Sequence, residues 1–278
     1  MFTKTKTIIL FALSLIIASS AAYAGTAHIG GFQNPVGDIA HKVDNLYNFI
    51  FYITGFICLL VEGVILYSIW RFRRSKNKTA AKFSHNTPLE IFWLTVPAII
   101  CVIIAWKSFE SMRFIRSMPE EAIDVEVIAS QFAWDFDYPD LKISAPEIDI
   151  EEKAKNETWL KELTAFNEGF TIKELVVPVN TNVRVHVTAR DVIHAFYVPA
   201  LMVKIDAMPG RINYQWFNIP TEGTYIGQCA ELCGAAHGQM YFSVKAVSKN
   251  DYRKWVNAQR TEAGLPPFNA IELAKLSK

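Results

Sequence analysis

Two things that many chains of this length have are scarce in this one: net charge and cysteine. Its 28 lysine and arginine residues are balanced by 27 aspartate and glutamate residues, so the net charge is only +1. A nucleic-acid-binding surface draws on an excess of positive charge, and the chain as a whole has almost none. The four cysteines form no Cys-x-x-Cys-His motif. The sequence therefore argues against a nucleic-acid partner and offers no haem-attachment motif.

Apolar residues, in contrast, are abundant and are gathered in two long stretches. Hydrophobic residues make up 51% of the chain, and the mean hydropathy is +0.16, which is high for a soluble protein. Residues 49–70 are interrupted by one charge, Glu62, and residues 89–106 contain Pro97 as a tolerated kink. Each stretch is long enough to cross a bilayer. We predict a transmembrane helical hairpin over residues 46–110, with helices at about 47–70 and 89–109.

The flanking segments predict the orientation of this hairpin. Residues 71–82 contain six basic side chains and no acidic one, which places them in the cytoplasm by the positive-inside rule. Residues 1–24 carry early lysines, a short apolar run and a terminal Ala-Tyr-Ala, as in a signal peptide, although an uncleaved first membrane helix is the alternative. Polar residues 25–45 are then an external N-terminal arm. The remainder of the chain is expected on the periplasmic or outer side of the inner (cell) membrane.

From residue 122 the pattern changes to that of short strands. Val183, Val185 and Val187 alternate with polar residues, and turn signals such as Pro209-Gly210 separate further strand candidates. We expect an antiparallel sandwich or barrel over residues 122–250. Within the charged segment of residues 141–171, the apolar residues from Trp159 to Phe166 recur at helical spacing and predict a surface helix. Residues 251–278 form a C-terminal helix and tail, started by the capping box Ser248-x-x-Asp251.

The segment from Gly227 to Met240 holds the residues with the clearest chemistry. Cys229, Cys233, His237 and Met240 offer two thiols, an imidazole and a thioether, and such soft ligands select copper. A metal-free loop or a Cys229–Cys233 disulfide are simpler alternatives, but neither uses the histidine and the methionine. A mononuclear blue-copper site needs only one cysteine. A second thiolate lets two sulfurs bridge two metal ions, provided that another histidine such as His194 joins them.

Three motifs together resemble one protein family. The pattern Cys229-x-Glu231-x-Cys233-x3-His237-x2-Met240 resembles the binuclear copper A motif of cytochrome c oxidase subunit II. The segments 191–194 (Asp-Val-Ile-His) and 204–211 (Lys-x-Asp-Ala-x-Pro-Gly-Arg) are similar to segments of the same family, in the same order. The resemblance covers roughly residues 49–256.

The resemblance implies a fold, a function and a set of partners. The fold is a two-helix transmembrane hairpin followed by an all-β, cupredoxin-like Greek-key barrel. The chain would be subunit II of a haem-copper terminal oxidase, with subunit I, which carries haem and copper B, and subunit III as partners. Its copper A centre would accept electrons from cytochrome c and pass them to haem in subunit I. There oxygen is reduced to water, coupled to proton translocation.

The same resemblance assigns ligands to two metals. It implies two copper ions whose ligands are His194, Cys229, Glu231, Cys233, His237 and Met240. Glu231 would bind copper through its backbone carbonyl, so its carboxylate is free to contribute to a magnesium site shared with subunit I. Two other functions are the alternatives to an electron-accepting oxidase subunit. A quinol oxidase subunit II lacks the copper ligands, and a membrane-anchored copper carrier or assembly protein binds metal without turnover.

Two further residues are candidates for proton and electron entry. Glu90 lies in a segment similar to the family's proton-channel entrance, and it is equally suited to the N-terminus of a helix. At residues 132–134 the family has two tryptophans around an aromatic residue, whereas this chain has Phe132-Ala133-Trp134. Trp134 is therefore the candidate for electron entry and for part of the surface on which the donor docks, with packing in the core as the alternative.

Acidic residues dominate the part of the chain predicted to lie outside the membrane. Residues 124–249 contain 17 acidic and 11 basic side chains, a net charge of −6. Such a surface attracts a basic electron donor. The candidates for this role are Asp135, Asp137, Asp140 and Asp191, and dispersed carboxylates that only maintain solubility are the alternative.

Overall fold

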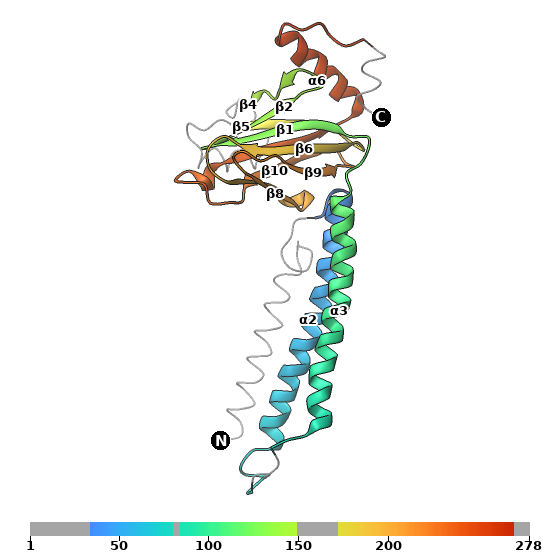
Figure 1. Cartoon of the computed structure of the whole chain (residues 1–278), viewed down its shortest axis with the longest axis vertical. Helices are drawn as coiled ribbons and strands as arrows, with labels where there is room; N and C mark the ends of the chain where they lie inside the picture. Colours follow the sequence, from blue (N-terminus) through green and yellow to red (C-terminus); the bar gives the residue numbers. More distant parts are fainter. Residues whose placement is uncertain (1–33, 80–83, 149–171, 270–278) are drawn as a thin grey trace, which may run out of the picture. The chain divides into compact units, whose positions relative to one another are not determined.

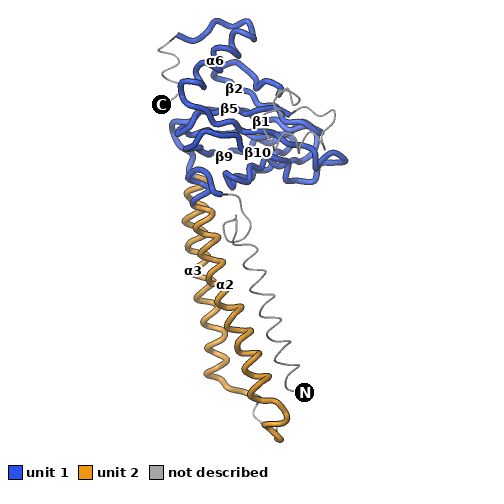
Figure 2. Tube along the Cα trace, turned by 180° about the vertical axis from the view of Figure 1, so that it is seen from behind, with its two compact units in different colours: residues 1–41, 117–278 blue, residues 42–116 orange. Residues whose placement is uncertain are grey.

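A computed structural model of the chain describes residues 34–79, 84–148 and 172–269. The described residues belong to two compact units, a helical unit of residues 42–116 and a β unit containing residues 117–278 and the start of the chain up to residue 41 (Figure 2). The expected signal peptide and the surface helix expected around Trp159 lie outside the described residues.

The helical unit contains two long helices that run side by side (Figure 1). They are α2 (Gly37–Arg71) and α3 (Thr87–Arg116), and both are long and apolar enough to cross a membrane. Large apolar side chains such as Leu59, Leu94 and Trp106 point away from the helical unit and are exposed. Surfaces of this kind are stable in lipid or against other apolar helices. The predicted helical hairpin is therefore confirmed.

Helix α2 begins ten residues earlier than the predicted start near residue 47. Its first turn is capped by a residue from the β unit: the backbone N–H of Asp38 donates to Oδ1 of Asn218 over 2.9 Å, and Nδ2 of Asn218 donates to the Asp38 carboxylate over 2.7 Å. Gly37 has φ +85°, and a Cβ at this position would collide with the backbone oxygen of Asn218. The helix start is thus stabilised by a partner 180 residues away.

The β unit is a sandwich of two sheets (Figure 1). The five-stranded sheet contains, in spatial order, β3 (Ile143–Ser144), β2 (Ala133–Tyr138), β1 (Ile123–Ser130), β6 (Asn182–Ala189) and β9 (Asn213–Asn218). The six-stranded sheet contains β4 (Glu147–Ile148), β5 (Ile172–Pro178), β11 (Tyr241–Val247), β10 (Gly223–Cys229), β7 (His194–Val198) and β8 (Val203–Ala207). The predicted all-β domain after the hairpin is confirmed.

Two strand pairs differ from a purely antiparallel arrangement. β1 pairs with β6 in parallel, as does β5 with β11, whereas the other neighbouring strands are antiparallel. The strands of both parallel pairs are far apart in sequence, so a crossover connection brings them together. One consequence matters for function: β1 and β6 end at the same edge, and the residues that follow them are neighbours there.

The core between the sheets follows the two-residue period of the strands. On β6 the buried side chains are Val183, Val185 and Val187, as their alternation predicted. Phe242 of β11 stacks on Phe196 of β7 with ring centroids 4.7 Å apart. Phe196 shares β7 with the predicted ligand His194, and Phe242 lies two residues after the predicted ligand Met240.

The C-terminal helix α6 (Lys249–Glu262) packs on the β unit. Its first turn is capped by Ser248, whose hydroxyl accepts a hydrogen bond from the backbone N–H of Asp251 over 3.1 Å, which confirms the predicted capping box. Tyr252 and Val256 are buried, and the Arg260 guanidinium donates to the backbone oxygen of Leu141 over 2.6 Å.

Candidate metal centre

The predicted metal ligands come from two segments that the six-stranded sheet places side by side. His194 is the first residue of β7, and Cys229 is the last residue of its neighbour β10. The loop from β10 to β11 then carries Cys233, His237 in the short 3-10 helix η2 (His237–Gln239), and Met240. The backbone N–H of Cys229 donates to the carbonyl oxygen of Met240 over 3.0 Å. This bond joins the two ends of the loop, so Met240 lies next to Cys229.

All six predicted ligands lie in one cluster of atoms. Sγ of Cys229 is 3.9 Å from Nδ1 of His194, 3.8 Å from Sγ of Cys233 and 3.3 Å from the backbone oxygen of Glu231. Sγ of Cys233 is 3.6 Å from Nδ1 of His237 and 3.9 Å from Sδ of Met240. One histidine thus lies beside each sulfur of the cysteine pair. The structure brings together what the sequence places in two segments.

The two thiols are buried and are not joined. Their sulfur atoms are 3.8 Å apart, and a disulfide bond is about 2.05 Å long. Cys229 and Cys233 are 6% and 5% exposed. Burial, followed by the neighbouring Cys229, raises the pKa of the Cys233 thiol to about 12. A metal ion would have to displace the protons by its own charge, which is the usual coupling between thiolate ligation and pH.

His194 is oriented by a carboxylate outside the cluster. Its Nε2 lies 2.9 Å from Oδ1 of Asp191, so Nδ1 is the ring nitrogen that faces Cys229. Burial alone would raise the pKa of Asp191, but hydrogen bonds from His194 and from the backbone N–H groups of Gln131 and Val192 lower it overall. Asp191, predicted as one of the carboxylates that attract a donor, has this second contact within its own chain.

Trp134 lies in the core, where it is 2% exposed and cannot line a docking surface on this chain. Its ring makes edge contacts with His194, Phe196 and Phe242 at centroid distances of 6.2, 6.0 and 5.3 Å. The prediction that Trp134 provides docking surface is therefore corrected in favour of core packing. The reason is the strand alternation: Trp134 faces inward together with Phe136 and Tyr138. Phe132, just before β2, is half-buried.

The negative charge of Asp135 is paired with two cations of its own chain. Its carboxylate accepts hydrogen bonds from Nζ of Lys173 and from Nη1 of Arg190, each over 2.7 Å. Burial raises the pKa of this carboxyl, whereas the lysine and arginine contacts lower it further than burial raises it. A carboxylate held in this way adds little to an attractive negative surface. Of the predicted set, Asp140 is exposed and free of such a bridge among the described residues.

Glu90 closes a capping box at the start of α3. The backbone N–H of Leu89 donates to Oδ1 of Asn86 over 3.2 Å, and the backbone N–H of Asn86 donates to Oε1 of Glu90 over 3.1 Å. His85 lies 3.6 Å from the same carboxylate oxygen. The helix-terminal interpretation of Glu90 is thus what the geometry supports, and its side chain remains 40% exposed.

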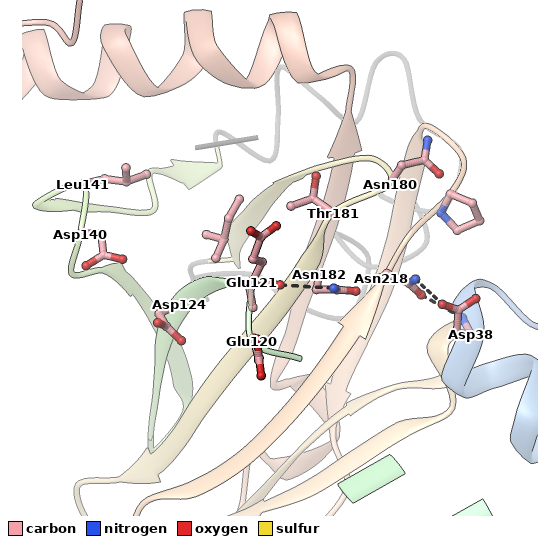
Figure 3. Close-up of a pocket in the computed structure, with 13 residues that line it drawn as sticks. Asp38, Glu120, Glu121, Asp124, Asp140, Leu141, Asn180, Thr181, Asn182 and Asn218 are labelled. Atoms are coloured by element: carbon pink, nitrogen blue, oxygen red, sulfur yellow. Dashed lines mark hydrogen bonds between the residues drawn. The ribbon is translucent and has the colours of Figure 1, made fainter. Parts of the chain in front are cut away.

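A pocket of about 630 Å³ lies in the β unit where β1 and β6 begin (Figure 3). Carboxylates of Asp38, Glu121, Asp124 and Asp140 line it, and Nδ2 of Asn182 donates to the backbone oxygen of Glu121 over 3.3 Å. The metal-ligand cluster instead adjoins the segments that follow the ends of these two strands. None of its six residues lines the pocket.

The sequence patterns did not single out Gln131, which contacts both ligand segments. Its backbone N–H donates to Asp191, and its side-chain amide donates to the backbone oxygen of Cys233. The only signal in the sequence is its position immediately before the 132–134 segment. Spacing motifs indicate candidate ligands, whereas a residue that holds two loops through hydrogen bonds leaves no such pattern.

Fold and site together define a class of protein: an apolar helical hairpin long enough to cross a membrane, followed by a β-sandwich in which His194, Cys229 and Cys233 are close enough to hold a metal ion. Comparison with protein-family models gives two matches. Residues 123–247 match "Cytochrome C oxidase subunit II, periplasmic domain", and residues 24–111 match "Cytochrome C oxidase subunit II, transmembrane domain".

Individual relatives agree. The probable cytochrome c oxidase subunit 2 of Rickettsia felis is 38% identical over 235 residues, covering 84% of this chain and 72% of that protein. Cytochrome c oxidase subunit 2 of Cereibacter sphaeroides is 39% identical over 242 residues, with coverages of 83% and 80%. The crystal structure of the periplasmic domain of subunit II of cytochrome oxidase of Bradyrhizobium japonicum is 35% identical, with a TM-score of 0.45, and covers 52% of this chain and 99% of that one. The chain belongs to the cytochrome c oxidase subunit II family.

Proposed function

We propose that this chain is the electron inlet of its oxidase, with a copper A centre that receives electrons from cytochrome c and passes them to haem in subunit I. Oxygen reduction to water, coupled to proton translocation, would then take place in the partner. The observation that carries the proposal is the cluster in which the two cysteine sulfurs lie 3.8 Å apart and four other candidate ligand atoms each lie 3.3–3.9 Å from one of them. An oxidase subunit without a metal centre has no use for this cluster.

The donor set fits two copper ions. His194, Cys229, Cys233 and His237 offer two thiolates and two imidazole nitrogens, with one histidine beside each sulfur. The Met240 thioether and the Glu231 carbonyl oxygen add one weaker donor each. Soft sulfur donors combined with imidazole favour copper over magnesium or calcium. Two copper ions held by these residues would supply single-electron transfer, with the charge change shared between them.

The residues around the cluster keep the ligands in place and keep water out. Both thiols are buried, and Met240 is 1% exposed. Asp191 holds the His194 ring through Nε2, and the Trp134 ring packs against the same imidazole. A ligand shell that is held in this manner changes little in geometry when the charge changes, which favours fast single-electron transfer.

Three further roles complete the proposal. The Glu231 side chain is exposed while its backbone oxygen faces Cys229, so its carboxylate is available for magnesium shared with subunit I. Glu90, half-exposed at the start of α3, would lie at the proton entrance to subunit I in addition to capping its helix. The six cations of residues 71–82 support an inner-membrane orientation with the β unit on the periplasmic side.

Copper stoichiometry and electron paramagnetic resonance of the purified oxidase test the copper A assignment. We expect two copper ions in this chain and the signal of a mixed-valence pair. Cys229→Ser and Cys233→Ser should each abolish that signal, whereas Cys58→Ser in α2 should leave it unchanged. One labile copper ion per chain would instead favour a copper carrier, and no copper would favour a quinol oxidase subunit. A mixed-valence signal retained in either ligand variant would contradict the assignment.

A further inference from the structure

The turn between β1 and β2 contacts both segments that carry metal ligands. It follows the end of β1 at Ser130 and holds Gln131 and Phe132. One of the two segments contains Asp191 and His194, and the other is the loop from Cys229 to Met240. The turn supplies none of the six candidate ligands. Its contacts therefore act on the segments that carry them.

On the side of the cysteine loop, Gln131 acts through its side chain. Its Nε2 donates a hydrogen bond to the backbone oxygen of Cys233 over 2.6 Å. The next residue, Gly234, has φ +141°, and a Cβ there would lie 2.8 Å from Nε2 of Gln131 and 3.0 Å from the Phe132 ring. A side chain at Gly234 would therefore push the loop away from the turn. The glycine permits the close approach on which the hydrogen bond depends.

On the side of the histidine, Gln131 acts through its backbone. Its N–H donates to Oδ2 of Asp191 over 2.7 Å, and Oδ1 of the same carboxylate lies 2.9 Å from Nε2 of His194. The carboxylate is further held by the backbone N–H of Val192 over 2.7 Å. A continuous series of hydrogen bonds thus joins His194 to Cys233 through Asp191 and Gln131.

We infer that Gln131 is a positioning residue that sets the spacing between the histidine segment and the cysteine loop. This inference rests on the proposed copper A centre. The side-chain amide has the N–H donor that the Cys233 carbonyl needs, whereas glutamate is an acceptor when ionised and methionine has no donor. Loss of the amide leaves the carbonyl without this bond and frees the loop to move relative to His194. Substitution of a residue that hydrogen-bonds to a metal-ligating residue typically lowers metal affinity by ~10–100-fold.

Gln131→Met and Gln131→Glu test the side-chain half of this connection, because both keep the backbone bond to Asp191. Gln259→Ala on α6 is the matched control, since its amide bonds only to Glu262 in the described structure. The assembled oxidase carrying each variant is challenged with a copper chelator, and its copper resonance is recorded. The metal-free full chain is treated with iodoacetamide, and peptides containing Cys229 and Cys233 are quantified by mass spectrometry.

We expect both Gln131 variants to lose copper about tenfold faster than the unsubstituted chain and the control, with an altered copper hyperfine pattern. In the metal-free chain, we expect their two buried cysteines to be alkylated several-fold faster, because the loop opens more often. Copper retention, resonance and alkylation rates equal to those of Gln259→Ala would overturn the inference. An unsubstituted chain that binds no copper pair would refute the proposed function instead, while the alkylation rates would still report on the role of Gln131 in holding the loop.

Discussion

Nε1 of Trp134 donates a hydrogen bond to the backbone oxygen of Met240 over 3.4 Å, so a core residue of β2 supports the loop that carries the proposed metal ligands. The same oxygen accepts a hydrogen bond from the backbone N–H of Cys229. Trp134 also contacts the His194 ring. Aromatic packing therefore connects the sandwich core to both ligand segments, and the effects of substituting Trp134 should originate in the core.

Trp134→Ala should create a cavity and lower the free energy of unfolding of the β unit by about 3–5 kcal/mol. Because the hydrogen bond to Met240 is lost as well, we also expect an altered copper spectrum. Trp134→Phe should have a smaller effect on both quantities. Denaturant unfolding followed by near-ultraviolet circular dichroism measures the stability, with Ile212→Ala, at an exposed position, as the control. Normal stability and spectrum together with slowed reduction by cytochrome c would restore the docking role.

The sequence was sufficient for the elements whose signal is local. Cys229, Cys233, His237 and Met240 lie in one short segment, and their spacing carries the resemblance that implies the ligand set. The inward face of β2 was also readable, because Trp134 and its apolar partners alternate with Asp135 and Asp137. The alternation places Trp134 in the core, whereas the resemblance to the family's aromatic segment predicts a docking surface at the same residue.

The parts that could not be predicted depend on partners far away in the chain. The start of α2 requires Asn218, and the role of Gln131 requires both Asp191 and Cys233 to be in place. The compensation of Asp135 likewise depends on Lys173 and Arg190 from β5 and from the end of β6. Each of these contacts joins segments that are far apart in the chain, and the periodicity of a single segment does not reveal which segments meet.

Asp124 should make the stability of the β unit depend on pH. Its carboxylate accepts hydrogen bonds from Nε and Nη2 of Arg184 over 2.6 and 2.8 Å and lies 2.9 Å from Nε2 of His186. The guanidinium of Arg184 is the main cause that lowers the pKa of Asp124. A lowered folded-state pKa stabilises the fold above the unfolded pKa of about 3.9, and this contribution is lost as the pH falls through the folded-state pKa.

We therefore expect Asp124→Asn to lower the free energy of unfolding by about 1 kcal/mol at pH 7. The difference from the unsubstituted chain should shrink below about pH 4. Unfolding of the full chain in detergent at several pH values measures this, and Glu222→Gln in an exposed turn is the control. A difference of the same size at pH 7 and pH 3 would show that the ion pair is not its cause.

The loop between α2 and α3 tests the proposed orientation. Asn77→Cys, in a background with Cys58→Ser and Cys101→Ser, places a reactive thiol among the basic residues of this loop. We expect an impermeant maleimide to label it in inverted vesicles and not in intact spheroplasts, because the loop is cytoplasmic. Glu222→Cys in the β unit should show the opposite pattern. If the maleimide labels the loop cysteine in intact spheroplasts, the orientation is reversed.

Tyr138 and Tyr252 provide a matched pair for testing how the β unit satisfies its buried polar groups. Both side chains are fully buried, at 1% and 0% exposure. The Tyr138 hydroxyl donates to the backbone oxygen of Val176 over 2.8 Å and accepts from its N–H over 2.9 Å. The Tyr252 hydroxyl has no hydrogen-bond partner among the described residues. The same chemical change at the two positions should therefore have different effects.

Tyr138→Phe leaves both backbone groups of Val176 without their partner, and we expect the free energy of unfolding to fall by about 2 kcal/mol. Tyr252→Phe removes a buried hydroxyl that bonds to none of the described residues, so stability should fall by no more than about 0.5 kcal/mol and can rise. Denaturant unfolding of both variants, with copper content as a check on the distant metal cluster, measures the difference. Equal losses would mean that the loss of the hydroxyl itself, and not its bonds to β5, determines the effect.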